Sequence, residues 1–225
     1  MDGDVLMEAV RSRHSVRRYD EKPLSEHERR EMERIVDVCN AEGHLKCALV
    51  LDSPDAFAGT KSRLAKFSGV RNYVVVMGSD REGLDERGGY WGERIVLEAQ
   101  NLGLRTCWVG LTYSRRRLAC DVPDGVRVVS VITLGHGVDD GTAHRSKPVE
   151  ELALVNGEPA EWFDMGMESV MLAPSAMNRQ GYRFTLRRDG KVEAKSFGGA
   201  YSQVDLGIAK LHFEIGSGKG PEVWA

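Results

Sequence analysis

The chain has 225 residues, 41% hydrophobic and 29% charged, a balance typical of a folded globular protein with a buried core. Its 31 lysines and arginines against 34 acids give a formal net charge of −3, which excludes a general attraction to nucleic acid or to an anionic membrane surface. No run of apolar residues approaches the roughly 20 needed to cross a bilayer, and residues 1–4 lack the basic and apolar regions of a signal peptide. We therefore expect a cytoplasmic protein with a small-molecule substrate and no nucleic-acid or membrane partner.

Four cysteines, Cys39, Cys47, Cys107 and Cys120, form no Cys-x-x-Cys pair and have no histidine at metal-ligand spacing. Four cysteines suffice for two disulfides. Because no export signal accompanies them, we expect reduced thiols, each packed as a small hydrophobic side chain. The sequence predicts no metal site.

Predicted helices and strands alternate through the first part of the chain. A short helix over 4–11 leads into a basic segment. Ser25 and Glu28 then form a capping-box pattern, and apolar residues follow at helical spacing until Gly43 suits the end of the helix. The patterns next predict a strand at 46–51, a helix at 54–67, a buried strand at 72–77, a long helix at 89–102, a strand at 105–109, a short helix at 114–119 and a strand at 126–134. This order indicates a layered core of sheet and helices.

The composition changes at 135–147, a stretch rich in glycine, aspartate and histidine. We expect it to separate a first half, residues 1–150, from a C-terminal half, residues 151–225, with both packed as one globular unit. The second half is predicted to hold a helix at 162–172, a hairpin of strands 182–186 and 191–196, a helix at 204–215 and a flexible tail at 216–220.

The basic segment 13–19, of sequence RHSVRRY, is the first candidate site. On an extended chain Arg13, Ser15 and Arg17 fall on one side of the backbone. Two guanidiniums and a hydroxyl suit a phosphate dianion, because arginine offers paired donors that match phosphate oxygens. The alternative is a solvated basic turn, since runs of charge often lie on wet surface.

The strand that ends in Trp108, Val109 and Gly110 is the second candidate. Its backbone N–H groups and its aromatic ring suit a flat ligand, and the glycine lets the backbone approach closely. Without further information the same residues also describe a buried strand with a tryptophan in the core.

Two later segments complete the set of candidates. Arg145 and Lys147 are two residues apart, so on an extended chain both point the same way and suit a phosphate; the alternative is a basic loop between the halves. The segment 173–184 begins with Pro174 and contains Ser175 and Asn178, small polar residues that favour turns. It fits a pocket wall as well as a plain helix-to-strand connection.

Together the four segments resemble the FMN-dependent nitroreductase superfamily. Residues 13–19 look like its arginine-serine signature, 89–110 like its long helix and Gly-Leu-x-x-Cys-Trp-x-Gly strand, 145–152 like its Arg-Lys-Pro-Leu-Glu-Glu segment, and 173–184 like its Ala-Pro-Ser-Ala-x-Asn-x-Gln-Pro-Trp-x-Phe motif. In most of the family that last motif follows soon after the arginine signature, whereas in this chain it comes last. The order resembles the branch called putative TM nitroreductases, over residues 5–215.

The resemblance implies an α+β fold with a central, mostly antiparallel sheet flanked by helices and a C-terminal segment that completes a second half. It also implies an FMN-dependent oxidoreductase that passes electrons from NAD(P)H through flavin N5 to a small electron-poor acceptor, such as a nitroaromatic or a quinone. The site would be completed by a homodimer or within a pseudo-dimeric monomer. A flavin-binding sensor without turnover, flavin breakdown and reductive dehalogenation remain alternatives, because a fold does not determine its reaction.

The resemblance also assigns cofactor contacts residue by residue. It implies that Arg13, Ser15, Arg145 and Lys147 bind the FMN phosphate. Arg17 would contact the ribityl chain or the ring edge, and it is the candidate for stabilising negative charge on the reduced ring. No catalytic acid or base is implied. The full predicted cofactor-binding set is Arg13, His14, Ser15, Arg17, Trp108, Val109, Gly110, Arg145, Lys147, Pro174, Ser175, Ala176 and Asn178. Gly181 and Tyr182 replace the family's Pro-Trp, so we expect a looser or differently shaped pocket wall there.

Overall fold

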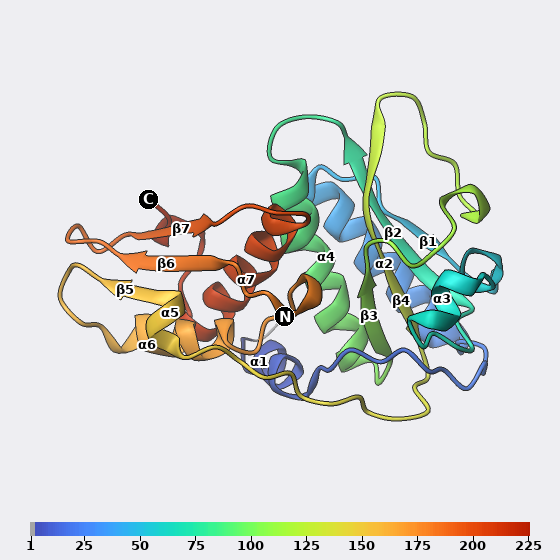
Figure 1. The fold of residues 1–225 in the computed structure, drawn as a ribbon, viewed down its shortest axis with the longest axis horizontal. Helices are drawn as coiled ribbons and strands as arrows, with labels where there is room; N and C mark the ends of the chain where they lie inside the picture. The colour runs from blue at the N-terminus through green and yellow to red at the C-terminus, as the bar shows by residue number, and fades with distance from the viewer. Residues whose placement is uncertain (1–2) are drawn as a thin grey trace.

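The structure, a computed structural model, describes residues 3–225. Its main sheet has four strands in the order β1-β2-β4-β3, all antiparallel: β1 (Ala48–Val50), β2 (Asn72–Ser79), β4 (Val126–Gly135) and β3 (Arg105–Val109). A smaller three-stranded sheet forms in the other half (Figure 1), with β6 (Tyr182–Leu186) between the parallel β5 (Ala153–Val155) and the antiparallel β7 (Val192–Ser196). The predicted α+β fold with a mostly antiparallel central sheet is confirmed.

Strand β2 is buried along nearly its whole length because both faces of the main sheet are covered. Val74 and Val76 share one core cluster with residues of α2 (Glu26–Gly43) and α4 (Leu84–Asn101). Tyr73 and the other alternate residues belong to a separate cluster on the opposite face. This period of two is the one that a strand covered on both sides requires.

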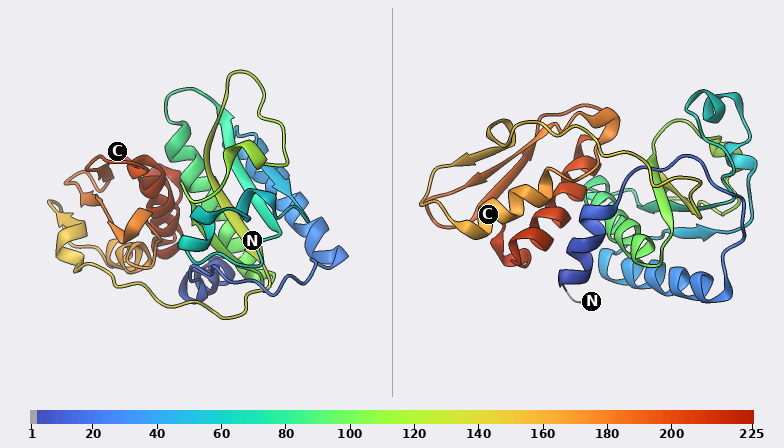
Figure 2. Two further views of the ribbon diagram at one scale, coloured as in Figure 1. Left: turned by 45° about the vertical axis from the view of Figure 1, so that its right-hand side comes forward. Right: turned by 90° about the horizontal axis from the view of Figure 1, so that it is seen from below.

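The helix pair α4 and α7 (Ser202–Ser217) joins the two halves at the centre of the molecule (Figures 1 and 2). The two backbones approach closely at glycines. A methyl group at Gly207 would overlap the carbonyl oxygen of Glu86, and one at Gly89 would overlap the carbonyl oxygen of Val204. Because both obstacles are backbone atoms, no side-chain rotation relieves the overlap.

The remaining elements are short or flank this centre. They are the helices α1 (Gly3–Ser12), α3 (Thr60–Leu64), α5 (Val149–Leu152) and α6 (Glu161–Val170), and the 3₁₀ turns η1 (Asp55–Phe57), η2 (Arg115–Arg117), η3 (Ala176–Asn178) and η4 (Pro221–Val223). Residues 138–148 contain no helix or strand and cross from β4 to the second half along the lower edge of the view in Figure 1. No helix within residues 3–225 combines the length and the apolar character needed to span a membrane.

Most predicted elements are confirmed, but the predicted helix over 54–67 is wrong. The turn η1 and the helix α3 take its place, separated by Gly59, whose backbone is extended with φ −84° and ψ 165°. Lys66 then adopts a left-handed conformation with φ 65°, which ends any further helical turn. The long helix also begins at Leu84 rather than near Gly89, directly after the left-handed Gly83.

The predicted flexible tail at 216–220 is also wrong. Helix α7 continues through Ser217, and the chain beyond it is anchored by aromatic contacts. The ammonium of Lys219 lies 5.5 Å from the ring centroid of Trp162. Trp224 packs against the main core and donates its indole N–H to Glu214 Oε1 at 2.6 Å. The glycines of 216–220 favour a bend, while the aromatic residue behind them fixes it.

The cysteine prediction agrees with the structure as far as packing is concerned. Cys39, Cys47 and Cys107 are buried, Cys120 is half-buried, and all four are free thiols. Cys39 and Cys47 belong to the main core cluster, and Cys107 belongs to the cluster on the opposite face of the sheet.

The close approach of α4 and α7 generates a stability prediction. Alanine at Gly207 should lower the free energy of unfolding by about 1–3 kcal/mol, because overpacking against backbone outweighs alanine's better helix propensity. Urea denaturation followed by circular dichroism measures the change. In the control Gly3→Ala the new methyl meets nothing within 4 Å, so stability should not fall. Equal stability of Gly207→Ala and the parent chain would contradict the described packing.

Candidate functional site

The basic segment that follows α1 lies in extended form beside β3. Ser15 forms a bridge with Thr106, and the Val16 N–H donates to the Thr106 carbonyl oxygen at 2.9 Å. The buried Tyr19 hydroxyl donates to the Val16 carbonyl and pairs with Thr133 Oγ1, both at 2.8 Å. Burial raises the pKa of Tyr19 well above its ordinary value, so this phenol stays protonated. The segment is therefore held at two points against the sheet.

A cavity of about 470 Å³ lies where this segment meets the second half of the chain. Ligand pockets of small molecules typically have roughly 300–1,000 Å³. The lining residues come from the first half, from the crossing segment and from the turn after α6: Arg13, Ser15, Arg17, Arg18, Lys66, Asp139, Gly141, Thr142, His144, Pro174, Ser175, Met177 and Asn178. One chain thus supplies both walls. We call this the phosphate-side cavity, for the charge described next.

Positive charge dominates the phosphate-side cavity. Among residues 3–225 the lining holds four cations, Arg13, Arg17, Arg18 and Lys66, and one carboxylate, Asp139. That carboxylate is already paired with Arg18 at 2.7 Å, and this hydrogen bond lowers the pKa of Asp139. Arg17 and Lys66 have no carboxylate at ion-pair distance within residues 3–225 and are left to attract an anionic ligand, and arginine donors match phosphate oxygens in geometry.

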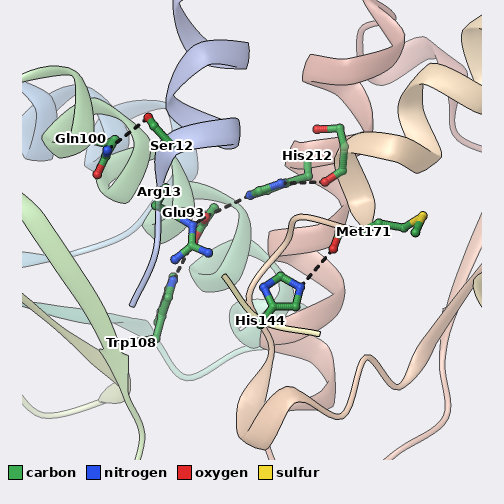
Figure 3. A network of polar contacts seen from close by, with 9 residues as sticks. Ser12, Arg13, Glu93, Gln100, Trp108, His144, Met171 and His212 are labelled. Atoms are coloured by element: carbon green, nitrogen blue, oxygen red, sulfur yellow. Dashed lines mark hydrogen bonds and ion pairs between the residues drawn. The ribbon is translucent and has the colours of Figure 1, made fainter. Parts of the chain in front are cut away.

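Arg13 is held by a buried carboxylate on the central helix (Figure 3). Its Nε lies 3.7 Å from Oε1 of Glu93, whose side chain is fully buried. Glu93 also accepts the indole N–H of Trp108 at 2.7 Å and lies 3.0 Å from Nε2 of His212. The other ring nitrogen of His212 lies 3.1 Å from the Ser169 carbonyl oxygen, which can only accept, so Nδ1 carries a proton. Glu93 therefore ties Arg13 to β3 and to α7.

The opposite wall of the cavity is a strained turn. Met177 and Asn178 have left-handed backbones with φ 53° and 54°. The Ala176 N–H donates to Asp205 Oδ1 at 2.9 Å, and Ser175 Oγ accepts the Gln180 N–H at 3.0 Å. Such conformations persist only where surrounding contacts hold them, and they gather at binding sites. The buried Asp205 on α7 supplies one of those contacts.

A second, larger cavity of about 710 Å³ opens at the other end of β3. Gly110 lines it directly after the strand, and a methyl group there would overlap the ring of Tyr201. From Thr106, beside Ser15, to Gly110 the chain advances four residues, about 13 Å in a strand. The two cavities therefore lie along one strand. We call this second one the Gly110 cavity.

A known protein family matches nearly the whole chain, including the segments that form the cavity walls. The family described as "Putative TM nitroreductase" matches residues 5–217. The chain belongs to this family. The match runs through both walls of the phosphate-side cavity, and the resemblance deduced from the motifs is confirmed. No curated protein matches the chain.

Solved structures show the same fold at low identity. A "putative nitroreductase" from Thermotoga maritima has a TM-score of 0.66 and 22% identity, covering 93% of this chain and 82% of that one. One from Desulfovibrio desulfuricans, in complex with FMN, has a TM-score of 0.53 and 20% identity, covering 69% and 97%. A "Putative NADH dehydrogenase/NAD(P)H nitroreductase" from Parabacteroides distasonis has a TM-score of 0.52 and 18% identity, covering 65% and 95%.

The structure brings part of the predicted site of this nitroreductase-family chain together. The predicted residues in the lining of the phosphate-side cavity are Arg13, Ser15, Arg17, Pro174, Ser175 and Asn178. Ala176 lies in the same turn. Gly110 lines the second cavity instead. The arginine segment and the late Ala-Pro-Ser motif, about 160 residues apart in the chain, thus meet across one cavity.

Other predicted contacts lie elsewhere: Arg145 and Lys147, predicted to share the phosphate, are outside the lining of the phosphate-side cavity. Lys147 donates its ammonium to the Gln180 carbonyl oxygen at 3.2 Å, and Arg145 is exposed. Neither lines the phosphate-side cavity, because the buried Gln180 amide binds the backbone on both sides of Ser146 and turns this segment toward the hairpin. His14 does not line the cavity either.

Trp108 and Val109 pack into the core rather than into the phosphate-side cavity, as in the alternative interpretation of that strand. Tyr182 is fully buried in the main core and does not line the phosphate-side cavity. Among residues 3–225, no group of three histidine, cysteine or acidic side chains is arranged to hold a metal ion.

Several site residues carried no sequence signal. Lys66 and Thr142 lie in segments without a motif, and Glu93 looks like one more polar residue on a helix. His144 lines the cavity with its Nε2 at 3.0 Å from the Met171 carbonyl oxygen, and burial lowers its pKa. Only the meeting of distant segments identifies these side chains.

The buried carboxyl of Asp205 generates a pH prediction. Burial raises its pKa from 3.8 to about 6. A carboxyl whose pKa is higher in the folded state favours folding when protonated, so this contribution is full below about pH 4 and is lost as the pH rises through about 6. The Asp205→Asn protein keeps an acceptor for the Ala176 N–H and stays neutral. At pH 7 it should be more stable than the parent chain by on the order of 2 kcal/mol.

Urea denaturation at several pH values between about 4 and 7 tests this linkage. The stability difference between Asp205→Asn and the parent chain should grow with pH. The exposed Asp164→Asn on α6 serves as the control for the general effect of removing one negative charge, and the growth with pH should be larger for Asp205→Asn. A constant difference for Asp205→Asn across the range would contradict the raised pKa.

Proposed function

We propose that this nitroreductase-family chain is an FMN-dependent oxidoreductase that passes electrons from NADH or NADPH to a small electron-poor acceptor. The observation that carries the proposal is the phosphate-side cavity, where Arg13, Ser15 and Arg17 face the Pro174–Asn178 turn. The FMN complex from D. desulfuricans supports the cofactor, and the name of the P. distasonis protein supports a nicotinamide donor.

The residues present fit the phosphate end of FMN. Arg13 is buried, and its Nε has no hydrogen-bond partner within the described chain. Its charge is already paired with Glu93, so what this guanidinium would offer a bound phosphate is hydrogen-bond donors at the cavity wall. We assign the phosphate to Arg13 and Ser15 with Lys66 as the further cation. Lys66 replaces Arg145 and Lys147, whose side chains lie outside the cavity.

The other end of the cofactor would extend along β3 toward Gly110. Arg17 is exposed at the rim of the phosphate-side cavity, with its guanidinium carbon 5.9 Å from the Phe67 ring centroid. From there it can approach the ribityl chain or the ring edge. The Gly110 backbone at the end of β3 carries no side chain and lies against the Tyr201 ring, so the flavin ring would lie beside this contact.

Bound FMN would supply hydride and electron transfer chemistry at its ring. The part of the chain is to bind and orient. Arg13 and Ser15 would fix one end, and Arg17 would stabilise the negative charge that reduction places at the ring edge. We assign no side-chain acid or base to the first half-reaction, since hydride transfer between stacked rings depends on position and orientation.

The purified chain tests the function directly. It should be yellow, release FMN on denaturation as identified by mass spectrometry, and lose its visible flavin absorption when NADH or NADPH is added without oxygen. Protein that binds FMN but is bleached by neither nicotinamide would contradict the oxidoreductase and favour a flavin-binding sensor. Colourless protein that takes up no added FMN would contradict both.

The assignment of the arginines is tested by FMN affinity. Arg13→Ala and Arg17→Ala should each weaken FMN binding by about 1.5–3 kcal/mol through the loss of a charge-assisted hydrogen bond. Fluorescence titration of the apoprotein measures the dissociation constant. Arg11→Ala is the control, because Arg11 is exposed at the end of α1 and does not line the cavity.

Arg13→Ala also removes a partner of the buried Glu93, so circular dichroism must confirm that the variant is folded. Arg17→Ala changes an exposed side chain and keeps the test independent of folding. Unchanged FMN affinity in the Arg13 and Arg17 double variant would show that the phosphate binds elsewhere.

A further inference from the structure

The Gly110 cavity carries positive charge that has no role in the proposed binding of the FMN phosphate. Lys61, Arg115 and Arg116 line it and are exposed. No carboxylate within residues 3–225 lies at ion-pair distance from any of the three. Arg127, which also lines the cavity, is by contrast paired with Asp80 and Asp85, each at 2.8 Å. The uncompensated charge therefore comes from α3 and from η2.

Hydrogen bonds to neighbouring elements hold the turn η2 in place. The turn η2 begins at Arg115, whose guanidinium donates to the Val128 carbonyl oxygen at 2.9 Å. The preceding Ser114 N–H donates to the Ala56 carbonyl oxygen at 2.8 Å. These bonds tie the turn to β4 and to η1. Arg115 and Arg116 thus sit on a supported backbone, so their charges belong to the cavity.

Aromatic side chains complete the cavity. Tyr113 and Tyr201 both line it, and the Tyr201 ring covers the Gly110 backbone. Tyr201 has a left-handed backbone with φ 64° at the start of α7. This conformation is uncommon for a residue with a side chain and is costly unless the surroundings hold it. Burial raises the pKa of Tyr201, which keeps its hydroxyl protonated as a hydrogen-bond donor.

We propose that the Gly110 cavity binds a flat aromatic acceptor that carries an anionic group such as a carboxylate. Arg115 and Arg116 select the charge, and Tyr201 contacts the ring. The assignment rests on the proposed function, because the acceptor must lie beside the cofactor ring near Gly110. For a nitroaromatic acceptor, NAD(P)H and one solvent proton deliver two electrons and two protons in all. One N–O bond breaks, and the products are a nitroso compound, water and NAD(P)⁺.

A nicotinamide donor is also aromatic and anionic, since it carries phosphates. The same cations would suit it, so the two half-reactions must be measured separately. Two probes of nearly equal shape isolate the charge of the acceptor: 4-nitrobenzoate is an anion, and 4-nitrobenzamide is neutral.

The experiment compares the FMN-loaded parent protein with the double variant Arg115→Gln, Arg116→Gln. Titration calorimetry gives the dissociation constant of each probe, and steady-state assays give kcat/KM. The parent should prefer 4-nitrobenzoate. The double variant should lose about five- to tenfold in affinity and kcat/KM for 4-nitrobenzoate, as expected for two exposed ion pairs, and should keep its values for 4-nitrobenzamide. Arg117→Gln is the matched control, because Arg117 belongs to η2 but does not line the cavity.

Three results would overturn the proposal. They are a parent protein that prefers the neutral probe or binds neither, an unchanged preference in the double variant, and an equal loss in Arg117→Gln. Stopped-flow reduction by NADPH separates the two ligands: slower flavin reduction with an unchanged probe preference would assign the charge to the donor's phosphates instead. Failure of the proposed function can be told apart from failure of this proposal. In that case NAD(P)H would not bleach the protein, while calorimetry would still show tighter binding of 4-nitrobenzoate than of 4-nitrobenzamide.

Discussion

The buried carboxylate of Glu93 is the contact on which the junction of the two halves depends. An isolated charge in the core costs several kcal/mol, so such a group persists only where partners surround it. Its partners come from distant parts of the chain: Arg13 after α1, Trp108 on β3 and His212 on α7. Removing any one of these elements leaves Glu93 poorly compensated. The position of Arg13 in the phosphate-side cavity is therefore coupled to the docking of α7.

Helix α7 has a second role in the same cavity. The glycine contacts with α4 let the two backbones approach, and this approach brings His212 within reach of Glu93. From the same helix, Asp205 binds the Ala176 N–H and holds the turn of the opposite wall. One helix thus positions a cation on one side and a strained turn on the other. This explains how a single chain builds both walls: they share a common support.

The sequence predicts this fold well where periodicity is strong and poorly where single residues decide. Strand β2 and helix α2 follow from apolar spacing and a capping box, because burial imposes the period. The segment 54–67 has helical composition, yet Gly59 and the left-handed Lys66 break it, and Trp224 anchors a tail whose glycines suggest flexibility. In the site, motifs indicated Arg13, Ser15 and the Pro174–Asn178 turn. Glu93, Lys66 and Tyr201 come together only through tertiary packing, which no local pattern encodes.

The two cavities differ in how their cations are held, and this difference suits different ligands. Arg13 is buried beside Glu93, in surroundings of low dielectric where a charge-assisted contact is strong and little screened by salt. Arg115 and Arg116 are exposed and have no carboxylate at ion-pair distance within residues 3–225, so their attraction is screened within about 8–10 Å at ordinary ionic strength and contributes only modestly to affinity. On the proposed function, the buried cation favours a cofactor that stays bound, and the exposed pair favours an acceptor that must leave after each turnover. Strand β3 sets the spacing between them.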